Sequence, residues 1–231
     1  MTDLQKSAGP ATGGADPTVE SFAALTTAAV SDALDRLGIA GQVQSVQRLS
    51  GQGTFAGRAV TLRYGPVGID GGTVGDYIDD VPAGSVLLLA NRGSTVGTVW
   101  GGLLSEVASM RGVAATVIDG LCRDIDTARR VGYSLYARSA WMRTGKDRVR
   151  LEATGEPVDM GGVRAAPGDI VVGDGDGVVI VPRPVEADVL AVAIEIDRAE
   201  DQILAAVHAG ERLDAARARL GYHALQTRKD R

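Results

Sequence analysis

The chain has 231 residues, of which 45% are apolar, enough to bury the core of one large domain. Its formal charge of −5 and its pI near 5.1 argue against a nucleic-acid partner, because binding to phosphate backbones requires clustered Lys and Arg. The single cysteine, Cys122, excludes an internal disulfide framework and is typical of the reducing cytoplasm.

The N-terminal segment is unlike the rest of the chain. Residues 1–16 are rich in Gly, Ala, Thr and Pro and lack the basic and apolar regions of a secretory signal. They predict a disordered leader, followed by a single domain over residues 17–231. No apolar run approaches the roughly 18 residues that a membrane-spanning helix needs. We therefore expect a cytoplasmic protein with no membrane partner.

The first part of the chain predicts helices that alternate with strands. Apolar side chains recur at helical spacing over residues 19–37, with a break expected near Thr26. Residues 68–80 predict a loop or a short helix, and residues 91–101 a loop. The elements that indicate an α/β layer are strands at 59–64 and 85–90, a helix at 103–111, a strand at 113–118, a turn at 119–124, a helix at 125–131 and a strand at 134–137.

The second part predicts a β-rich half. Short strands joined by tight turns are expected at 149–153, 158–163, 170–172 and 178–181. A long helix over residues 185–209 follows, with Gly210 as its cap. Because no internal repeat or linker separates the halves, we expect them to share one core in an α/β fold.

Glycines precede the helix expected at 103–111. Gly97, Gly101 and Gly102 allow backbone N–H groups at the helix start to point at an anion such as a carboxylate or an enolate. The segment lacks the dinucleotide fingerprint and the Lys-Ser/Thr of a nucleoside-triphosphate loop. A flexible connection with a small-residue packing contact is the alternative, and spacing alone leaves both open.

An arginine and an aspartate stand together where a buried strand meets the next helix. Ligands gather at the carboxyl ends of strands in α/β sheets, so Arg123 and Asp124 are well placed for chemistry. A guanidinium grips a carboxylate with two hydrogen bonds, and a carboxylate is a hard ligand for Mg²⁺ or Mn²⁺. The alternative is structural: Asp124 only caps the helix, and Arg123 only pairs with Asp126 or Glu106.

Other polar groups favour structural interpretations. A catalytic thiol at Cys122 would need a nearby base, but the two histidines, His208 and His223, stand near the C-terminus. The shortage of histidine also argues against a Ser-His-Asp hydrolase and an imidazole zinc site. Residues 173–177 lack the spacing of a calcium loop and predict a hairpin turn. The acidic stretch at 195–201 predicts a solvated helix face.

The run WGGLLSEVASMRGVAATVIDGLCRDIDTARRVGYSLYAR, at residues 100–138, resembles the 4-hydroxy-4-methyl-2-oxoglutarate aldolase family, which also contains the RraA-type regulators of ribonuclease E. Three further stretches support the resemblance. They are VSDALDRLG at 30–38, PAGSVLLL at 82–89 and GGVRAAPGDIVVGDGDGVVIVP at 161–182. The resemblance covers roughly residues 19–222, with the order and spacing of the four blocks kept.

The resemblance implies a swivelling β/β/α-type fold, assembled as a homotrimer or hexamer with active sites between subunits. It implies that Asp124 is a ligand of Mg²⁺ or Mn²⁺ and that Arg123 binds the pyruvate part of a small 2-oxo acid. Glu200, on the C-terminal helix of a neighbouring subunit, completes the catalytic set. The substrate carboxylate would lie on the turn formed by Gly101, Gly102, Leu103 and Leu104.

The activity implied is a metal-dependent lyase. It would cleave 4-hydroxy-4-methyl-2-oxoglutarate to pyruvate and decarboxylate oxaloacetate through the same enolate. Many relatives carry Glu where this chain has Gly102, so the base is expected to differ here. RraA-type regulators often lack the complete Arg-Asp pair, so Arg123 and Asp124 favour an enzyme. The alternatives are a regulator that binds an RNA-processing enzyme, and a lyase or hydratase that acts on a different acid.

Overall fold

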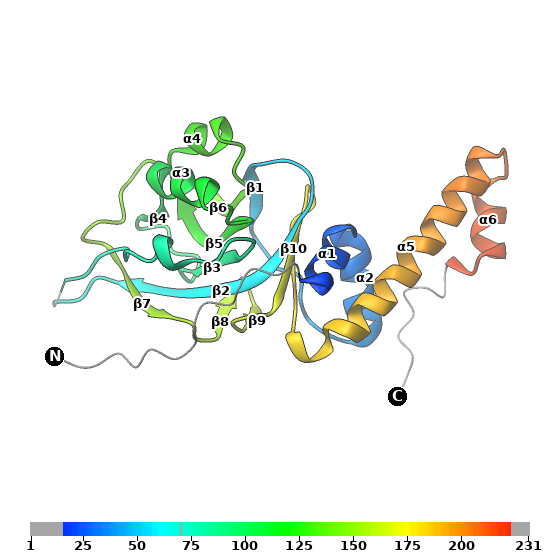
Figure 1. Ribbon diagram of the computed structural model, residues 1–231, viewed down its shortest axis with the longest axis horizontal. Helices are drawn as coiled ribbons and strands as arrows, with labels where there is room; N and C mark the ends of the chain where they lie inside the picture. The colour runs from blue at the N-terminus through cyan, green and yellow to red at the C-terminus, as the bar shows by residue number, and fades with distance from the viewer. Residues whose placement is uncertain (1–15, 70, 223–231) are drawn as a thin grey trace.

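The chain begins with a capped helix. The computed structural model describes residues 16–69 and 71–222 (Figure 1). The leader predicted over residues 1–16 therefore lies outside the described residues, except for Asp16. The Asp16 carboxylate accepts hydrogen bonds from the Thr18 and Val19 amides and caps α1 (Pro17–Ala23).

A curled sheet forms the centre of the molecule. Its main path runs β1-β6-β5-β3-β2-β10-β11, while β4 pairs with β5 and β7 pairs with β2. Its strands are β1 (Gln47–Ser50), β2 (Phe55–Pro66), β3 (Val86–Ala90), β4 (Thr98–Trp100), β5 (Ala115–Cys122), β6 (Leu135–Ala140), β7 (Val149–Thr154), β10 (Ile170–Gly173) and β11 (Val178–Val181). Strands β2, β3, β5 and β6 are parallel, so their carboxyl ends lie at one edge.

The sheet is covered on both faces. Helices α3 (Gly102–Met110) and α4 (Ile125–Arg130) and the short helix η1 (Ile78–Asp80) cover one face of the parallel part. The hairpin of β8 (Val158–Met160) and β9 (Val163–Ala165) covers the other. Helices α1 and α2 (Thr27–Leu37) pack against β10 and β11, together with the first half of α5. This arrangement gives three adjoining clusters of buried side chains.

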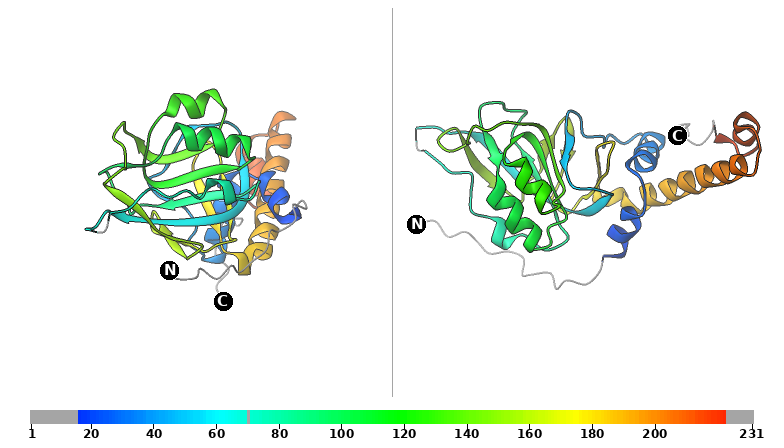
Figure 2. Two further views of the ribbon diagram at one scale, coloured as in Figure 1. Left: turned by 60° about the vertical axis from the view of Figure 1, so that its left-hand side comes forward. Right: turned by 90° about the horizontal axis from the view of Figure 1, so that it is seen from above.

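The C-terminal helices form an arm. After the short helix η2 (Arg183–Val185), helix α5 (Glu186–His208) extends away from the sheet and α6 (Leu213–Arg219) folds back along it (Figure 2). The sequence predicts α5 within two residues at each end but did not predict α6. No helix among the described residues is long and apolar enough to cross a membrane.

The predicted α/β class is confirmed, as is the helix break near Thr26, whose hydroxyl caps α2. Three local predictions were wrong. Residues 119–124 are not a turn, because β5 continues through Cys122 with all of its residues buried between neighbouring strands. The strand expected at 158–163 is the β8–β9 hairpin, with positive φ at Gly161 and Gly162. Residues 91–101 contain β4, which pairs with β5.

One carboxylate joins the β-rich half to the N-terminal helices. Asp174, in the predicted hairpin turn between β10 and β11, accepts hydrogen bonds from the Thr27 amide at 2.8 Å and the Thr27 hydroxyl at 2.7 Å. Burial opposes ionisation of Asp174, but these bonds and a third from the Asp176 amide outweigh it and hold the pKa of Asp174 below its ordinary value.

We expect Asp174→Ala to lower the free energy of unfolding at pH 7 by about 1–2 kcal/mol, the usual value of a helix cap. A carboxyl with a depressed folded pKa stabilises the fold above its unfolded pKa and loses this effect as the pH falls through the folded pKa. The difference between wild type and variant should therefore shrink below about pH 4. Urea denaturation at several pH values measures it, with the exposed Asp176→Ala as the matched control. A difference that is independent of pH would contradict this role.

Candidate active site

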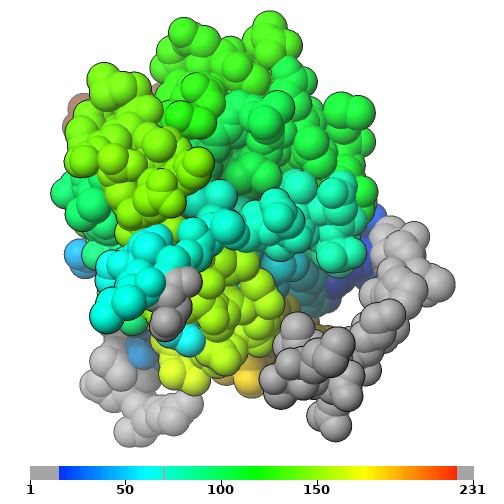
Figure 3. Space-filling model, turned by 90° about the vertical axis from the view of Figure 1, so that its left-hand side faces the viewer, coloured from blue at the N-terminus to red at the C-terminus, as the bar shows by residue number. Residues whose placement is uncertain are grey.

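A cavity of about 470 Å³ lies at the carboxyl ends of β4 and β5. One wall is the start of α3 and the segment that follows β5. The opposite wall comes from two loops, one after β2 and one before β7, and Figure 3 shows the latter in yellow-green beside the cyan end of β2. The lining residues are Gly72, Thr73, Val74, Thr98, Val99, Trp100, Gly101, Gly102, Leu103, Leu104, Arg123, Asp124, Thr144, Gly145, Lys146 and Asp147. The cavity is thus lined by six of the seven site residues that the sequence predicted, namely Gly101, Gly102, Leu103, Leu104, Arg123 and Asp124.

 Glu200 is the one predicted site residue that does not line it.

Asp124 takes an unusual backbone conformation. It follows β5 directly, with φ 59° and ψ 41°, a left-handed conformation that few residues other than glycine adopt. Its carboxylate makes no capping bond to α4, although Asp124 stands at the N-cap position. Instead, Oδ2 accepts a hydrogen bond of 2.9 Å from the amide of Gly102, at the start of α3. The structural alternative, in which the Asp124 side chain only caps its own helix, is therefore wrong.

Arg123 lies beside this carboxylate. Its Nε is 3.6 Å from Asp124 Oδ2, and both side chains are partly exposed to the cavity. The partners considered for a purely structural Arg123 are engaged elsewhere, since Asp126 pairs with Arg129 and Glu106 pairs with Arg130. The Arg123 amide donates to the carbonyl of Trp100 at 3.0 Å, which fixes the backbone of the pair against β4.

The glycines of the α3 turn are needed for close approach. A Cβ at Gly101 would lie 3.1 Å from Asp124 Oδ2, and one at Gly102 would lie 3.2 Å from Asp124 Cβ. The turn therefore packs directly against the Arg123–Asp124 segment. Because the Gly102 amide already binds Asp124, the amides of Leu103 and Leu104 are the first-turn donors without an intrahelical acceptor. These two amides are the part of the predicted cradle that is suited to a substrate carboxylate.

The loop before β7 forms a wall that sequence reasoning missed. Its backbone lies directly on β4, since the Thr98 amide donates to the Arg143 carbonyl at 3.1 Å and a Cβ at Gly145 would lie 2.1 Å from the Thr98 carbonyl oxygen. The loop carries Lys146 and Asp147 into the cavity lining. Gly145, a residue type common in turns, is the one local signal for a loop in this segment. Nothing in the neighbouring sequence indicates that the loop contacts β4.

Glu200 lies on α5, in the arm, and not on the cavity of its own chain. Burial raises the pKa of Glu200, as do the nearby carboxylates of Asp32, Asp197 and Asp201, whereas Arg217 opposes the shift. A single chain therefore does not bring Glu200 to Arg123 and Asp124. The predicted role of Glu200 depends on a second subunit and stays a prediction.

Cys122 ends β5 next to the pair, but its thiol is buried, and burial raises its pKa to about 12. The thiol therefore stays protonated at neutral pH, in agreement with the prediction that it fills space rather than attacks a substrate.

The carboxylates at the cavity are few for a divalent cation. Among the described residues, no group of three or more His, Cys, Asp or Glu side chains is placed to hold a metal. Mg²⁺ does not require such a cage, because it keeps several waters and is often bound by one or two carboxylates. Asp124 offers one such carboxylate, partly exposed at the cavity, with Oδ1 free of hydrogen bonds within the described part of the chain. The site thus fits an open, water-rich Mg²⁺ or Mn²⁺ centre.

Comparison with known proteins identifies similar chains. The family model described as RraA-like: Aldolase/RraA matches residues 27–180. The chain is 34% identical to Protein DlpA of Legionella pneumophila over 83% of its own length, but it spans only 32% of that longer protein. It is also 34% identical to the 4-hydroxy-4-methyl-2-oxoglutarate aldolase of Thermus thermophilus, over 58% of this chain and 79% of the relative.

Solved structures show the same fold. A protein from Pseudomonas syringae, described as uncharacterized, is 37% identical and superposes with a TM-score of 0.82 over 90% of this chain and 100% of its own. RraAS2 of Streptomyces coelicolor, described as an unusual member of the RNase ES inhibitor RraA protein family, is 26% identical. It superposes with a TM-score of 0.75 over 83% of this chain and 98% of its own. The fold predicted from the resemblance is therefore confirmed.

We expect Gly145→Ala to lower the free energy of unfolding by about 1–3 kcal/mol, as overpacking usually does, because the added methyl group would meet the Thr98 carbonyl and the Val149 side chain. Chemical denaturation measures the loss. Gly68→Ala is the matched control, since no atom would lie within 4 Å of its Cβ. Equal stability of the two variants would show that the loop does not rest on β4.

Proposed function

We propose a function from one premise: the chain belongs to the RraA-like family, whose model matches residues 27–180. In this proposal the cavity is the active site of a lyase that acts on a small 2-oxo acid and uses Mg²⁺ or Mn²⁺. The observation that supports it most is the convergence of Arg123, Asp124 and the first amides of α3 on one cavity.

The proposed reaction is cleavage of 4-hydroxy-4-methyl-2-oxoglutarate to pyruvate, with decarboxylation of oxaloacetate as a side activity. Support for the substrate comes from the Thermus thermophilus relative that carries this name, at 34% identity. Both reactions pass through the enolate of pyruvate. A site that binds the carboxylate and the 2-oxo group, and stabilises the negative charge that develops on the latter, therefore serves both.

Each group in the cavity has a role in this scheme. The amides of Leu103 and Leu104 bind the C1 carboxylate at the positive end of α3. Arg123 donates to the oxygens of the 2-oxo acid, where a fixed positive charge favours the enolate. Asp124 would hold the cation, which supplies Lewis acidity at the 2-oxo group when bound. The hydrogen bond from Gly102 and the neighbouring guanidinium hold the Asp124 carboxylate in the orientation that this task needs.

Proton transfer requires a further group. Gly102 has no side chain, and among the described residues that line the cavity none is a histidine or a glutamate. In the proposed homotrimer or hexamer, Glu200 of a neighbouring subunit would take the proton from the C4 hydroxyl through a water molecule. Its raised pKa suits a carboxyl that must both accept and release a proton. Decarboxylation needs no such base, so it depends on fewer groups than aldol cleavage.

A regulator that binds an RNA-processing enzyme is the second candidate. It is favoured by the match to RraAS2, at 26% identity. Such a protein would use the scaffold without turnover, because fold alone does not determine function. The two candidates differ at Asp124: the enzyme needs its carboxylate for turnover, whereas the regulator does not.

We expect purified protein with Mg²⁺ or Mn²⁺ to release pyruvate from oxaloacetate and from 4-hydroxy-4-methyl-2-oxoglutarate, at rates above the metal's own background. Chelation should abolish the excess rate. Asp124→Asn should lower it by roughly 100-fold or more, because the lost carboxylate holds the cation that stabilises the enolate. A coupled assay for pyruvate follows each reaction.

Asp126→Asn is the matched control, since the Asp126 carboxylate is exposed on α4, pairs with Arg129 and does not line the cavity. Full activity of Asp124→Asn at saturating Mg²⁺ would refute the assigned ligand. Activity on oxaloacetate alone would keep the enolate chemistry and reject the named aldol substrate. No activity on either compound would favour the regulator.

A shared site between subunits predicts complementation. Oligomers of Asp124→Asn alone and of Glu200→Gln alone should both be inactive in aldol cleavage. An equal mixture, dissociated and reassembled, should recover up to about one quarter of wild-type activity, because that share of sites receives an intact Asp124 and an intact Glu200. Glu195→Gln, on the same helix and paired with Arg36, should need no complementation. No recovery in verified mixed oligomers would assign Glu200 to the solvated face of α5.

A further inference from the structure

The charges that line the cavity are divided between its two walls. On one wall, Arg123 and Asp124 lie 3.6 Å apart and offset each other. On the other wall stand Lys146 and Asp147. Within the described part of the chain, the Lys146 ammonium has no hydrogen-bond or ion-pair partner, and only its backbone groups are bonded. The wall formed by the loops after β2 and before β7, called the far wall below, therefore presents to the cavity one cation that has no partner among the described residues.

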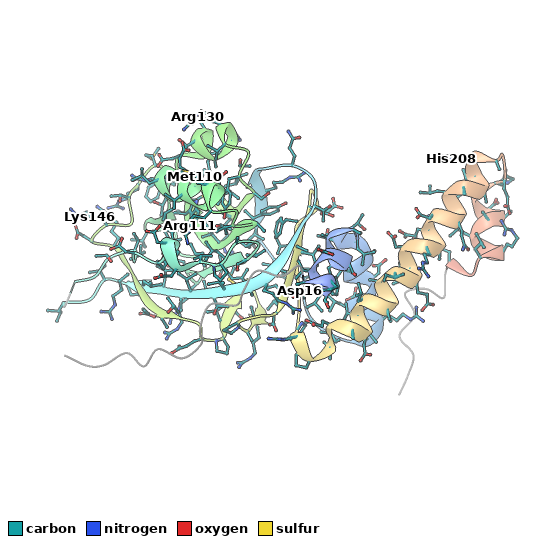
Figure 4. The ribbon with its side chains drawn as sticks, in the orientation of Figure 1. Asp16, Met110, Arg111, Arg130, Lys146 and His208 are labelled. Carbon is teal, nitrogen blue, oxygen red and sulfur yellow. The ribbon has the colours of Figure 1, made fainter. Side chains whose placement is uncertain are left out.

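The backbone that carries this cation is fixed. The Lys146 amide donates to the Thr144 hydroxyl at 3.2 Å, and the Lys146 carbonyl accepts from the Arg148 guanidinium at 3.0 Å. The amides of Arg148 and Val149 both donate to the Gly145 carbonyl at 2.9 Å. Figure 4 labels Lys146 on this loop between β6 and β7, at the end of the molecule away from the arm. Lys146 is thus held in place through its backbone, although its side chain is exposed.

The far wall lies where the end of a bound substrate opposite to its C1 carboxylate would be. If the C1 carboxylate lies on the α3 amides and the 2-oxo group on Arg123, the rest of the molecule extends across the cavity. The volume of about 470 Å³ lies within the range of pockets that hold drug-sized ligands, and it exceeds what a three-carbon acid needs. A longer substrate would therefore reach the loops that carry Thr73 and Lys146.

We propose that Lys146 is a specificity-determining residue that binds the second carboxylate of a dicarboxylic 2-oxo acid. This inference rests on the proposed function, because it takes the α3 amides and Arg123 as the site of the first carboxylate and the 2-oxo group. An ammonium attracts a carboxylate as a point charge. Asp147, on the same wall, repels a carboxylate that is not held by Lys146, so the pair favours one position for the second anion.

The test compares two ligands of equal chain length that cannot undergo aldol cleavage. 2-Oxoglutarate carries the second carboxylate, and 2-oxopentanoate has a methyl group in its place. Calorimetric titration of the full-length protein with Mg²⁺ should show that wild type binds 2-oxoglutarate about five- to tenfold more tightly, as a partly solvated charge pair allows. Lys146→Met should remove this preference without weakening the binding of 2-oxopentanoate. Lys146→Arg should retain most of it.

Arg143→Met is the matched control. It removes the same charge three residues away, from a side chain that lies over the Trp141 ring and does not line the cavity. Its preference should equal that of wild type. Equal binding of the two ligands to wild type, or a preference that survives Lys146→Met, would overturn the role of Lys146 and leave the proposed function intact. Failure of both ligands to bind wild type would overturn the proposed function, and this inference with it.

Discussion

The hydrogen bond from the Gly102 amide to the Asp124 carboxylate joins the end of β5 to the start of α3, and the candidate site depends on it. A left-handed aspartate is strained by about 1 kcal/mol or somewhat more. A hydrogen bond to a charged group contributes roughly 1.5–3 kcal/mol and offsets that strain. The fold therefore keeps Asp124 in a conformation that turns its carboxylate away from its own helix α4 and toward the cavity. Absence of a side chain at Gly102 allows this close approach.

Strand β2 connects this local geometry to the rest of the molecule. Its twelve residues pair in turn with β10, β3 and β7, so one strand spans the β-rich half and the parallel half. Strand β7 in turn fixes both parts of the far wall, because the Leu151 amide donates to the Thr73 carbonyl at 2.8 Å and the loop before β7 rests on β4. The two walls of the cavity are therefore both anchored to strands of one sheet.

The near wall could be predicted from the sequence, whereas the far wall could not. Arg123 and Asp124 closely follow the apolar strand predicted at 113–118, and glycines precede an apolar helix, so each signal lies within about ten residues of the site. Lys146 enters the cavity only because Gly145 touches the carbonyl of Thr98, nearly fifty residues earlier in the chain, a contact that leaves no periodic pattern. The same limit explains the missed strand β4, whose three residues are too few to show alternation. Helix α6 was missed because it has only one buried side chain, Ala216.

The groups proposed for substrate binding line the cavity, whereas the group proposed for proton transfer, Glu200, lies on the arm. One chain supplies amides, a guanidinium, carboxylates and an ammonium around the cavity, and in the proposed function these groups would bind a dicarboxylic acid at both of its ends. None of the described lining residues is a histidine or a glutamate, and the proposed function therefore assigns proton transfer to water and to Glu200 of a neighbouring subunit. Glu200 lies on an arm that leaves the sheet and has a carboxyl whose pKa is raised, first by burial. Under the proposed function, an isolated chain would therefore bind a 2-oxo acid and favour its enolate, whereas cleavage of a carbon–carbon bond beside a hydroxyl group would need Glu200 of a neighbouring subunit.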